Sequence, residues 1–305
     1  MIDLHIHTTN SDGDFSPIEI LKEAELKGIK YLAFADHNNV NAYSDLNKLD
    51  IPSIYSGTII IGVELEFCYK GRLFDMLGYG VDLEILKQSE LIKQGMVHST
   101  IEGETNILNR LKEVCDKLGI KYSKDLSIKN AYNMANDVLI DDILLYPENK
   151  VILDRMNIID RSTFYRKHFC EPTSPFYIDQ TKNAFSLEYV CNLIHEAGGK
   201  AFFAHPFVYH LDNIVEIMDM MRENNLIDGI ECAHRKHKPE QIEFLISYCN
   251  LHNLLKSGGS DKHTANHDLG YANNGNYQID ESLVEPWINA VRTYNQDIQN
   301  IQLKK

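Results

Sequence analysis

The chain has 305 residues, of which 44% are hydrophobic and 24% are charged, the usual balance of a globular protein. This length allows one large domain or two smaller ones, and either can bury a substantial core. The formal net charge of −14 argues against binding nucleic acid or an anionic membrane through overall charge, although it is compatible with a local basic pocket, and it suits a protein that gathers cations.

Four strands and one well-delimited helix are predicted in residues 1–83. IDLHIH predicts a short strand, and SPIEILKEAELKG predicts a helix that begins at Ser16, carries Pro17 in its first turn and ends at Gly28. The apolar run IKYLAFADH predicts a strand covered on both faces, as in a parallel sheet. TIIIGVELEF and RLFDMLGYGV predict the third and fourth strands.

The pattern changes near Asp82. Residues 84–183 are mainly helical in pattern, as in NILNRLKEVCDKLGI, where apolar residues recur on one helix face. After a helix in SLEYVCNLIHEAGG, strands resume at KAFFAHP, DGIECAH and LKSGGSDKH, and a terminal helix carrying Trp287 is expected from about Leu283. We therefore expect a helical subdomain at 84–183, inserted into a domain made of 1–83 and 184–305.

The alternation of strands and helices implies an α/β protein with a parallel sheet, either open or closed into a barrel. In both forms the ligand site gathers at the carboxyl ends of the strands. The six cysteines are scattered without a CxxC pair, which argues against a structural zinc site. No signal peptide and no apolar run of membrane-spanning length is visible, so we expect a cytoplasmic location, and no segment indicates an obligate protein partner.

Residues able to bind metal stand on or just after every predicted strand. Because these strand ends converge in space, we expect the side chains to meet at one rim. Alternate residues of a strand share a face, so His5 and His7 point the same way, about 7 Å apart at their backbones. Mixed imidazole and carboxylate donors suit zinc, manganese or iron. The candidates are His5, His7, His37, Glu64, Asp75, His205, His234, Asp261 and His263.

Each candidate also has an ordinary structural explanation. Glu64 is compatible with a charged strand end, Asp261 with a turn cap after two glycines, and His205 with a turn residue before a proline. That all of them are incidental, each near the same end of its strand, is much less probable than a shared metal site.

The motifs that carry these residues resemble those of the PHP family, named for polymerase and histidinol phosphatase. DLHIHTTNSDG, FADH, GVELEF, FFAHPF and GGSDKH occur in the family's order over most of the chain. The resemblance implies a distorted seven-stranded β/α barrel, a cluster of two or three divalent metal ions and phosphoesterase chemistry. The helical segment resembles the insertion of stand-alone members that hydrolyse phosphate from small nucleotide-like substrates.

Carried over motif by motif, the resemblance also implies ligand roles. The first metal would be bound by His5, His7 and Asp261; the second by Asp75 and His205, with Glu64 bridging these two metals; and the third by Asp12, His37 and His263.

The sequence departs from the family pattern at two places. Similar proteins usually have a histidine where this chain has Asp75, whose harder oxygen favours manganese or iron if it ligates; alternatively, Asp75 lies beside the site. Members often carry a histidine shortly after the equivalent of Arg161, where this chain has Thr163, with His168 further on. The loop therefore lacks a histidine at the position where the family pattern would place a substrate contact.

The resemblance implies attack on phosphorus by a metal-activated hydroxide held by Glu64 and its neighbours, since clustered dications activate water and neutralise phosphate charge. Arg235 is the leading candidate for a phosphate clamp because it follows the strand DGIECAH. His234 fits a ligand, a substrate contact or a packed strand end equally well, and Asp36 fits a hydrogen-bonding partner of a ligand. The further candidates for substrate contacts are Arg161, His237, Lys238 and Lys262.

Three functions are compatible with the sequence. The leading hypothesis is a metal-dependent phosphatase acting on a small nucleotide or related ester. The second is an exonuclease that trims short oligonucleotides with the same metals, which would need a local basic groove. The third is a metal-binding module without catalytic turnover.

Overall fold

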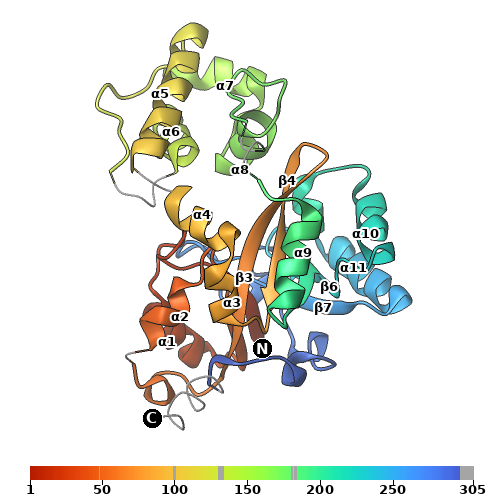
Figure 1. Ribbon diagram of the computed structural model, residues 1–305. Coiled ribbons are helices and arrows are strands. Elements are labelled where there is room, and N and C mark those ends of the chain that lie inside the picture. The colour runs from red at the N-terminus through yellow and green to blue at the C-terminus, as the bar shows by residue number, and fades with distance from the viewer. Residues whose placement is uncertain (48, 99–100, 130–133, 180, 182–183, 296–305) are drawn as a thin grey trace. The chain divides into compact units, whose positions relative to one another are not determined.

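The structure is a computed structural model that describes residues 1–47, 49–98, 101–129, 134–179, 181 and 184–295 (Figure 1). Contacts group the chain into two compact units. The barrel unit comprises Met1–Tyr69, Phe74–Gly95 and Phe185–Lys305, and the helical unit comprises Lys70–Leu73 and Met96–Ala184. The helix directly after residue 83 thus groups with the barrel unit, and the insertion limits 84 and 183 stay predictions.

The barrel unit is built on one seven-stranded sheet, whose strands stand in chain order. The strands are β1 (Ile2–Ile6), β2 (Tyr31–Phe34), β3 (Thr58–Tyr69), β4 (Arg72–Tyr79), β5 (Lys200–Phe203), β6 (Gly229–His234) and β7 (Leu255–Gly259). The two outer strands approach each other where Ile6 bridges Lys262 just after β7, so the sheet forms a nearly closed barrel. The predicted α/β barrel of seven strands is confirmed.

One strand runs against the others, contrary to the expected parallel sheet. Parallel pairing joins β1 to β2, β2 to β3, β5 to β6 and β6 to β7, whereas β4 pairs with β5 antiparallel. Only Lys70 and Gly71 separate β3 from β4, with φ angles of 50° and 74°. Two successive residues with positive φ form the tight turn of a hairpin, which reverses the chain without a crossover helix.

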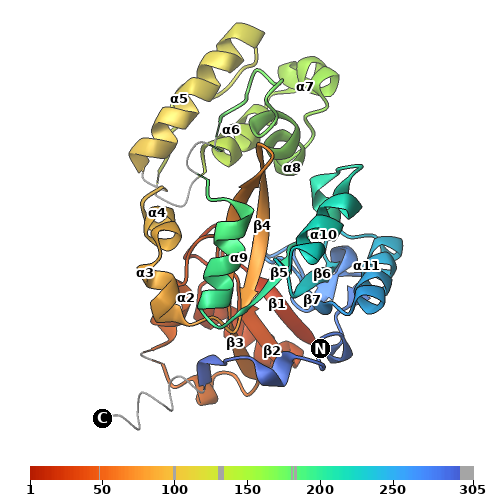
Figure 2. The same ribbon diagram turned by 45° about the vertical axis from the view of Figure 1, so that its right-hand side comes forward.

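Helices cover the outside of the sheet (Figure 2). They are α1 (Pro17–Lys27), α2 (Asn41–Leu46), α3 (Leu83–Gln88), α9 (Leu187–Glu196), α10 (Ile214–Glu223) and α11 (Pro239–His252). The next helix after α3, α4 (Glu90–His98), crosses the boundary between the two units, which lies after Gly95. The predicted limits of α1 are confirmed: the backbone N–H and hydroxyl of Ser16 donate to Glu19, Pro17 opens the first turn, and Gly28 ends the helix at φ 66°.

The expected terminal helix is wrong for the described residues. Glu281–Leu283 and Ile288–Ala290 are single 3₁₀ turns, and Pro286 between them lacks the N–H that a continuous helix would need. Trp287 is buried instead: its ring packs on Tyr79 and Phe202, and its Nε1–H donates to the carbonyl of Lys256 at 2.8 Å.

The helical unit has its own core. Its helices are α5 (Ile101–Leu118), α6 (Ala135–Ile143), α7 (Lys150–Met156) and α8 (Arg161–Phe164), followed by a π turn at Tyr165–Phe169. Leu111 of α5 is fully buried in this core, as the amphipathic pattern predicts, together with Leu139 of α6 and Phe164 of α8. Among the described residues of both units, no helix combines the length and apolar character needed to cross a membrane.

Candidate metal centre

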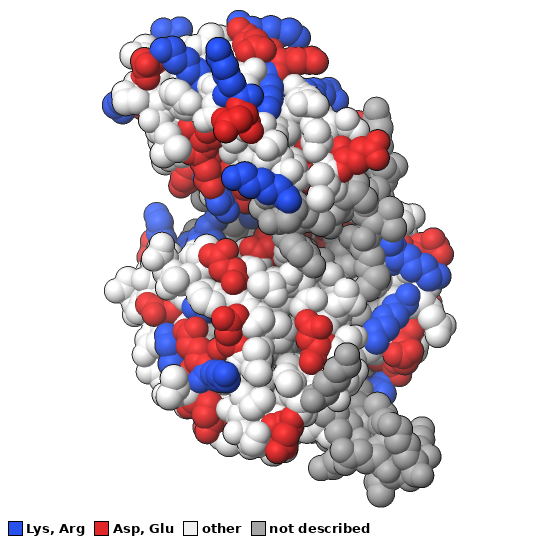
Figure 3. Space-filling model, turned by 90° about the vertical axis from the view of Figure 1, so that its left-hand side faces the viewer, with Lys and Arg blue, Asp and Glu red and all other residues white. Residues whose placement is uncertain are grey.

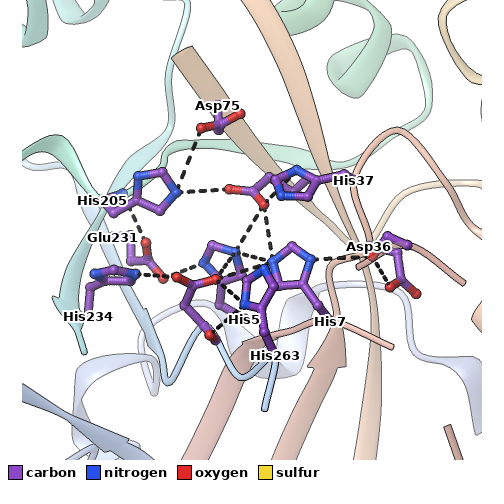
Figure 4. Close-up of polar contacts among 12 residues, drawn as sticks. His5, His7, Asp36, His37, Asp75, His205, Glu231, His234 and His263 are labelled. Carbon is purple, nitrogen blue, oxygen red and sulfur yellow. Dashed lines mark hydrogen bonds and ion pairs between the residues drawn. The ribbon is translucent and has the colours of Figure 1, made fainter. Parts of the chain in front are cut away.

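The nine residues to which the resemblance gives ligand roles meet at one end of the barrel: eight lie in or just after a strand, and Asp12 lies in the loop after β1. Figure 4 shows His5, His7, His37, Asp75, His205 and His263 gathered there. The donor atoms of the nine residues form four groups in which every atom lies within 4.8 Å of the others. The groups are His7, Asp12, His37 and His263; His5, His7 and Asp261; His5, Glu64 and His205; and His37, Glu64 and Asp75. Ligation itself stays a prediction.

Nitrogen and oxygen atoms face one another around His5 and His7. Nε2 of His5 lies 3.1 Å from Nε2 of His7 and 3.2 Å from Oε2 of Glu64. Nε2 of His7 lies 3.3 Å from the same Glu64 oxygen and 3.3 Å from Oδ1 of Asp261. This Glu64 oxygen is buried and has no hydrogen-bond partner among the described residues. A buried carboxylate oxygen in this state is costly unless a positive charge lies beside it.

Glu231 in β6 orients His5, and the sequence interpretation missed it. Oε1 of this fully buried glutamate lies 2.8 Å from Nδ1 of His5, and Oε2 accepts the backbone N–H of His205 at 2.9 Å. Because a carboxylate only accepts, neutral His5 keeps its proton on Nδ1 and turns the lone pair of Nε2 toward Glu64. A glutamate inside an otherwise apolar strand was the available signal.

A second group surrounds Asp12. Its Oδ1 lies 3.2 Å from Nδ1 of His7, and its Oδ2 lies 3.1 Å from Nε2 of His263 and 3.8 Å from Nε2 of His37. Asp12 Oδ1 is also buried without a hydrogen-bond partner among the described residues. The loop that carries Asp12 is held by Asp36, which accepts hydrogen bonds from the side chains of Thr8 and Ser11. Asp36 thus acts on this loop, and its expected hydrogen bond to a ligand stays a prediction.

A third group lies between Glu64, Asp75 and His205. Nε2 of His205 is 3.0 Å from Oε1 of Glu64 and 3.9 Å from Oδ2 of Asp75. Glu64 therefore turns one oxygen toward His205 and the other toward His5 and His7. This is the arrangement that a carboxylate bridging two cations requires.

His234 and Arg235 act on Asp261. The backbone N–H of Lys236 donates to Nδ1 of His234, so neutral His234 carries its proton on Nε2, which lies 3.1 Å from Oδ2 of Asp261. Nε of Arg235 donates to the same oxygen at 3.2 Å. Both contacts leave Oδ1 facing His5 and His7. These contacts indicate a role that the sequence interpretation did not consider for His234, the support of Asp261.

The carboxylates of the cluster also shift the pKa values of neighbouring side chains. Burial lowers the pKa of His5, but Glu231 and Glu64 outweigh it, and the net pKa lies well above the ordinary range. Burial, together with the charges of Asp75 and Glu64, raises the pKa of Glu66 to about 8. Both shifts reflect the concentration of carboxylates at this end of the barrel, which a bound cation would stabilise.

The backbone around the cluster has two residues with positive φ angles and one close approach between strands. His205 and Asp261 have φ angles of 28° and 49°, a left-handed region that residues other than glycine rarely occupy. A β-carbon on Gly259 would lie 2.3 Å from that of His5, so only glycine lets β7 pass this close to β1.

The substrate-contact candidates lie in different surroundings. Arg235 borders the cluster through Asp261, and Lys238 is exposed at the start of α11. His237 is fully buried, with Nδ1 2.9 Å from the carbonyl of Cys232. Lys262, also buried, donates to the carbonyl of His267 at 2.9 Å. The last two therefore have structural partners.

In the helical unit, Arg161 donates from Nε to Asp141 at 2.9 Å and from Nη1 to Asp137 at 3.2 Å. The hydroxyl of Thr163 caps α8 together with Asp160. Both nitrogens of His168 have partners in the same unit. Each of these three residues thus has partners within the helical unit.

The donor set fits divalent metal ions. Five imidazoles and four carboxylates supply the donors of the four groups, a mixture that suits zinc, manganese or iron. The buried, unpaired oxygens of Glu64 and Asp12 would each gain a positive partner.

Comparisons with known proteins agree with this geometry. A family model described as PHP domain matches residues 3–291. A 5'-3' exoribonuclease of Haemophilus influenzae is 25% identical over 296 residues, 93% of this chain and 97% of the relative. A 3',5'-nucleoside bisphosphate phosphatase of Chromobacterium violaceum is 25% identical over 269 residues, 86% of this chain and 87% of the relative.

Among solved structures, an amidohydrolase from Chromobacterium violaceum superposes with a TM-score of 0.67 at 20% identity, covering 98% of this chain and 96% of that chain. A likeness at this identity shows the fold.

Proposed function

This chain belongs to the PHP domain family, and on that basis we propose that it is a metal-dependent phosphoesterase that hydrolyses a phosphate ester of a small nucleotide-like substrate. The observation that carries the proposal is the convergence of Nε2 of His5, Nε2 of His7 and the unpaired Oε2 of Glu64 on one buried space. Unprotonated imidazoles and a carboxylate oxygen share such a space favourably when a cation fills it.

We assign two or three divalent ions to the cluster, with manganese, iron and zinc as the candidates. When bound, such ions lower the pKa of water and neutralise charge on the phosphate. His5, His7 and Asp261 would hold the first ion and Asp75 and His205 the second, with Glu64 between these two; Asp12, His37 and His263 would hold the third.

Arg235 would bind the phosphate. Its side chain is 19% exposed, and its Nε donates to Asp261, which fixes the guanidinium at the edge of the cluster. A guanidinium presents several donors in one plane, so its terminal nitrogens can donate to a phosphate oxygen while Nε keeps its carboxylate.

A relative and the charge of the chain both support a small phosphorylated substrate. The relative from Chromobacterium violaceum is named for nucleoside bisphosphates, and this chain carries a net charge of −14. On the face shown in Figure 3, the described Lys and Arg residues are interspersed with Asp and Glu instead of forming a continuous basic stripe. These three observations favour a small phosphorylated substrate over a long nucleic acid.

A second candidate function is 5'-3' trimming of short RNA. The observation that favours it is the exoribonuclease relative, which matches over 97% of its own length. The same ligands would serve both reactions, because each breaks a phosphate ester bond.

The test is a substrate screen with Mn²⁺ on the purified full chain after chelator treatment. Nucleotides, nucleoside bisphosphates, cyclic phosphates and short 5'-phosphorylated RNA are compared by released phosphate and by released nucleotide. We expect release of phosphate from small nucleotides, abolished by chelator and restored by Mn²⁺. Successive release of nucleotides from RNA would favour the exonuclease, and activity on none would contradict both.

A further inference from the structure

Tyr209 makes two hydrogen bonds to Asp75, the residue at which this chain departs from the usual histidine. The backbone N–H of Asp75 donates to the hydroxyl of Tyr209 at 2.8 Å, and that hydroxyl donates to Oδ2 of Asp75 at 3.1 Å. Tyr209 is the last residue of the 3₁₀ turn Pro206–Tyr209, and this turn begins directly after His205. Asp75 lies in β4. The pair therefore links two elements that both contribute predicted ligands.

The direction of the hydroxyl proton follows from the first bond. A phenol has one proton, and the Asp75 N–H takes one of its lone pairs. The proton is then available to the carboxylate of the same residue, so both bonds act together on Asp75. This geometry limits the rotation of a side chain that is 16% exposed and would otherwise have several rotamers.

The ring that carries this hydroxyl packs against three neighbouring rings. The ring of Tyr209 lies 4.7 Å from that of Phe74, 5.8 Å from that of Phe203 and 5.4 Å from that of His205, measured between centroids. Phe74 and Phe203 are buried in the barrel core. The phenol is thus a rigid support, because its ring cannot turn without moving packed neighbours.

The supported carboxylate faces the cluster. An oxygen of Asp75 lies within 4.8 Å of donor atoms of Glu64 and His37, and Oδ2 lies 3.9 Å from Nε2 of His205. An aspartate side chain is shorter than that of histidine, so it needs a support to present its oxygen at a fixed place.

We propose that Tyr209 is a positioning residue that directs Asp75 at the second cation, and that the Tyr209–Asp75 pair shifts the preference of this site toward Mn²⁺, relative to Zn²⁺, compared with a histidine at position 75. The pair replaces an imidazole nitrogen, which suits zinc, with an oriented carboxylate oxygen, which suits manganese. This inference rests on the proposed function, since it assumes that the cluster binds divalent ions.

The experiment is a double-mutant cycle on metal binding, with Tyr209→Phe, Asp75→His and the double variant. Mn²⁺ and Zn²⁺ affinity and stoichiometry are measured by calorimetric titration of chelator-treated protein. Tyr209→Phe keeps the packed ring and removes only the hydroxyl. We expect it to weaken one Mn²⁺ site by about 10- to 100-fold, the usual effect of losing a hydrogen bond to a ligand.

In the Asp75→His background, the same change should alter no Mn²⁺ site, and Asp75→His alone should shift the preference toward Zn²⁺. Tyr248→Phe is the matched control, because its hydroxyl donates to Asp219, away from the cluster, at 2.7 Å. It should leave every site unchanged.

An equal loss in both backgrounds, or no loss in Tyr209→Phe, would overturn the inference while leaving the proposed function intact. Unchanged preference between Mn²⁺ and Zn²⁺ in Asp75→His would overturn the selectivity. If the wild-type protein binds no divalent ion, the proposed function fails, and the inference fails with it.

Discussion

The surroundings of His168 in the helical unit and of the histidines in the barrel cluster differ in how hydrogen-bonding capacity is used. In the helical unit, Nδ1 of His168 lies 3.2 Å from the hydroxyl of Ser174 and Nε2 lies 2.9 Å from the carbonyl of Met156. In the barrel unit, Oε2 of Glu64 and Oδ1 of Asp12 lie beside imidazole nitrogens without a hydrogen bond among the described residues.

Burial of a histidine therefore does not by itself identify a metal ligand, as His168 and His5 illustrate. His168 has no lone pair left for a metal, because each ring nitrogen already faces a protein partner. His5 has one nitrogen fixed by Glu231 and the other turned toward two further donors. A ligand is recognised by lone pairs that converge, and the predictions below test that distinction.

Removing the carboxylate that we propose to bridge two ions should have the largest effect. Glu64→Gln keeps the size of the side chain and removes the charge on the oxygens that face His5, His7 and His205. Loss of a metal-bridging carboxylate removes several kcal/mol of transition-state stabilisation, so we expect a rate roughly a thousandfold lower. Elemental analysis should show at least one ion fewer per chain.

The matched control for that variant is Glu104→Gln, which changes another buried glutamate. Glu104 lies in the helical unit, and its Oε2 accepts the backbone N–H of Ala135 at 2.6 Å. It should keep the wild-type metal content. Equal loss of metal in both variants would contradict the distinction between the two units.

A smaller effect is expected from Glu231→Gln. The two oxygens of Glu231 accept from His5 and from the backbone of His205, and a carboxamide has only one oxygen. One of the two bonds must fail, which loosens either the tautomer of His5 or the placement of His205. We expect metal affinity to fall by about 10- to 100-fold in a titration. Wild-type affinity would show that Glu231 does not orient His5.

The strands were more predictable than their directions. Apolar runs next to polar ends identified all seven strands, because each strand buries its apolar residues. The direction of β4 depends on two residues, Lys70 and Gly71, whose positive φ angles produce a hairpin. The terminal segment failed for a similar local reason, since Pro286 interrupts a helical pattern.

In the site, the candidate ligands were predictable and their supports were not. Ligand types recur at strand ends, so a pattern along the chain indicates them. The contacts of Glu231 with His5, and of Tyr209 with Asp75, join residues far apart in sequence. Such contacts depend on the register of the closed sheet and on the turn after β5, which no local pattern encodes.

His168→Leu should affect stability and leave the metal content unchanged. The change removes two hydrogen bonds and leaves the Met156 carbonyl and the Ser174 hydroxyl without their partner. We expect the free energy of unfolding to fall by roughly 1–3 kcal/mol in urea titration. Loss of bound metal would mean that His168 serves the cluster.

The same variant should change the pH dependence of stability. Burial lowers the pKa of His168 in the folded protein, so the unfolded chain binds the proton more readily. Stability should therefore decrease as the pH falls below about 6.5, the ordinary histidine value. His168→Leu should weaken this decrease, and an unchanged slope would contradict the assignment.

The smallest effect is expected from Arg161→Ala, which tests whether the helical unit supplies a phosphate clamp. The guanidinium is 55% exposed and pairs with Asp137 and Asp141. Exposed ion pairs contribute little, so the free energy of unfolding should change by less than about 1 kcal/mol. KM for a small phosphate ester should stay within about threefold of wild type, because that guanidinium is already paired with two carboxylates.

The comparison variant is Arg235→Ala. The guanidinium of Arg235 lies against Asp261 at the cluster, and its loss should raise KM by about tenfold or more, as loss of a charge-assisted hydrogen bond does. If Arg161→Ala raises KM as much as Arg235→Ala, the helical unit takes part in binding phosphate. That result would contradict the proposal that Arg235 of the barrel unit binds the phosphate without help from Arg161.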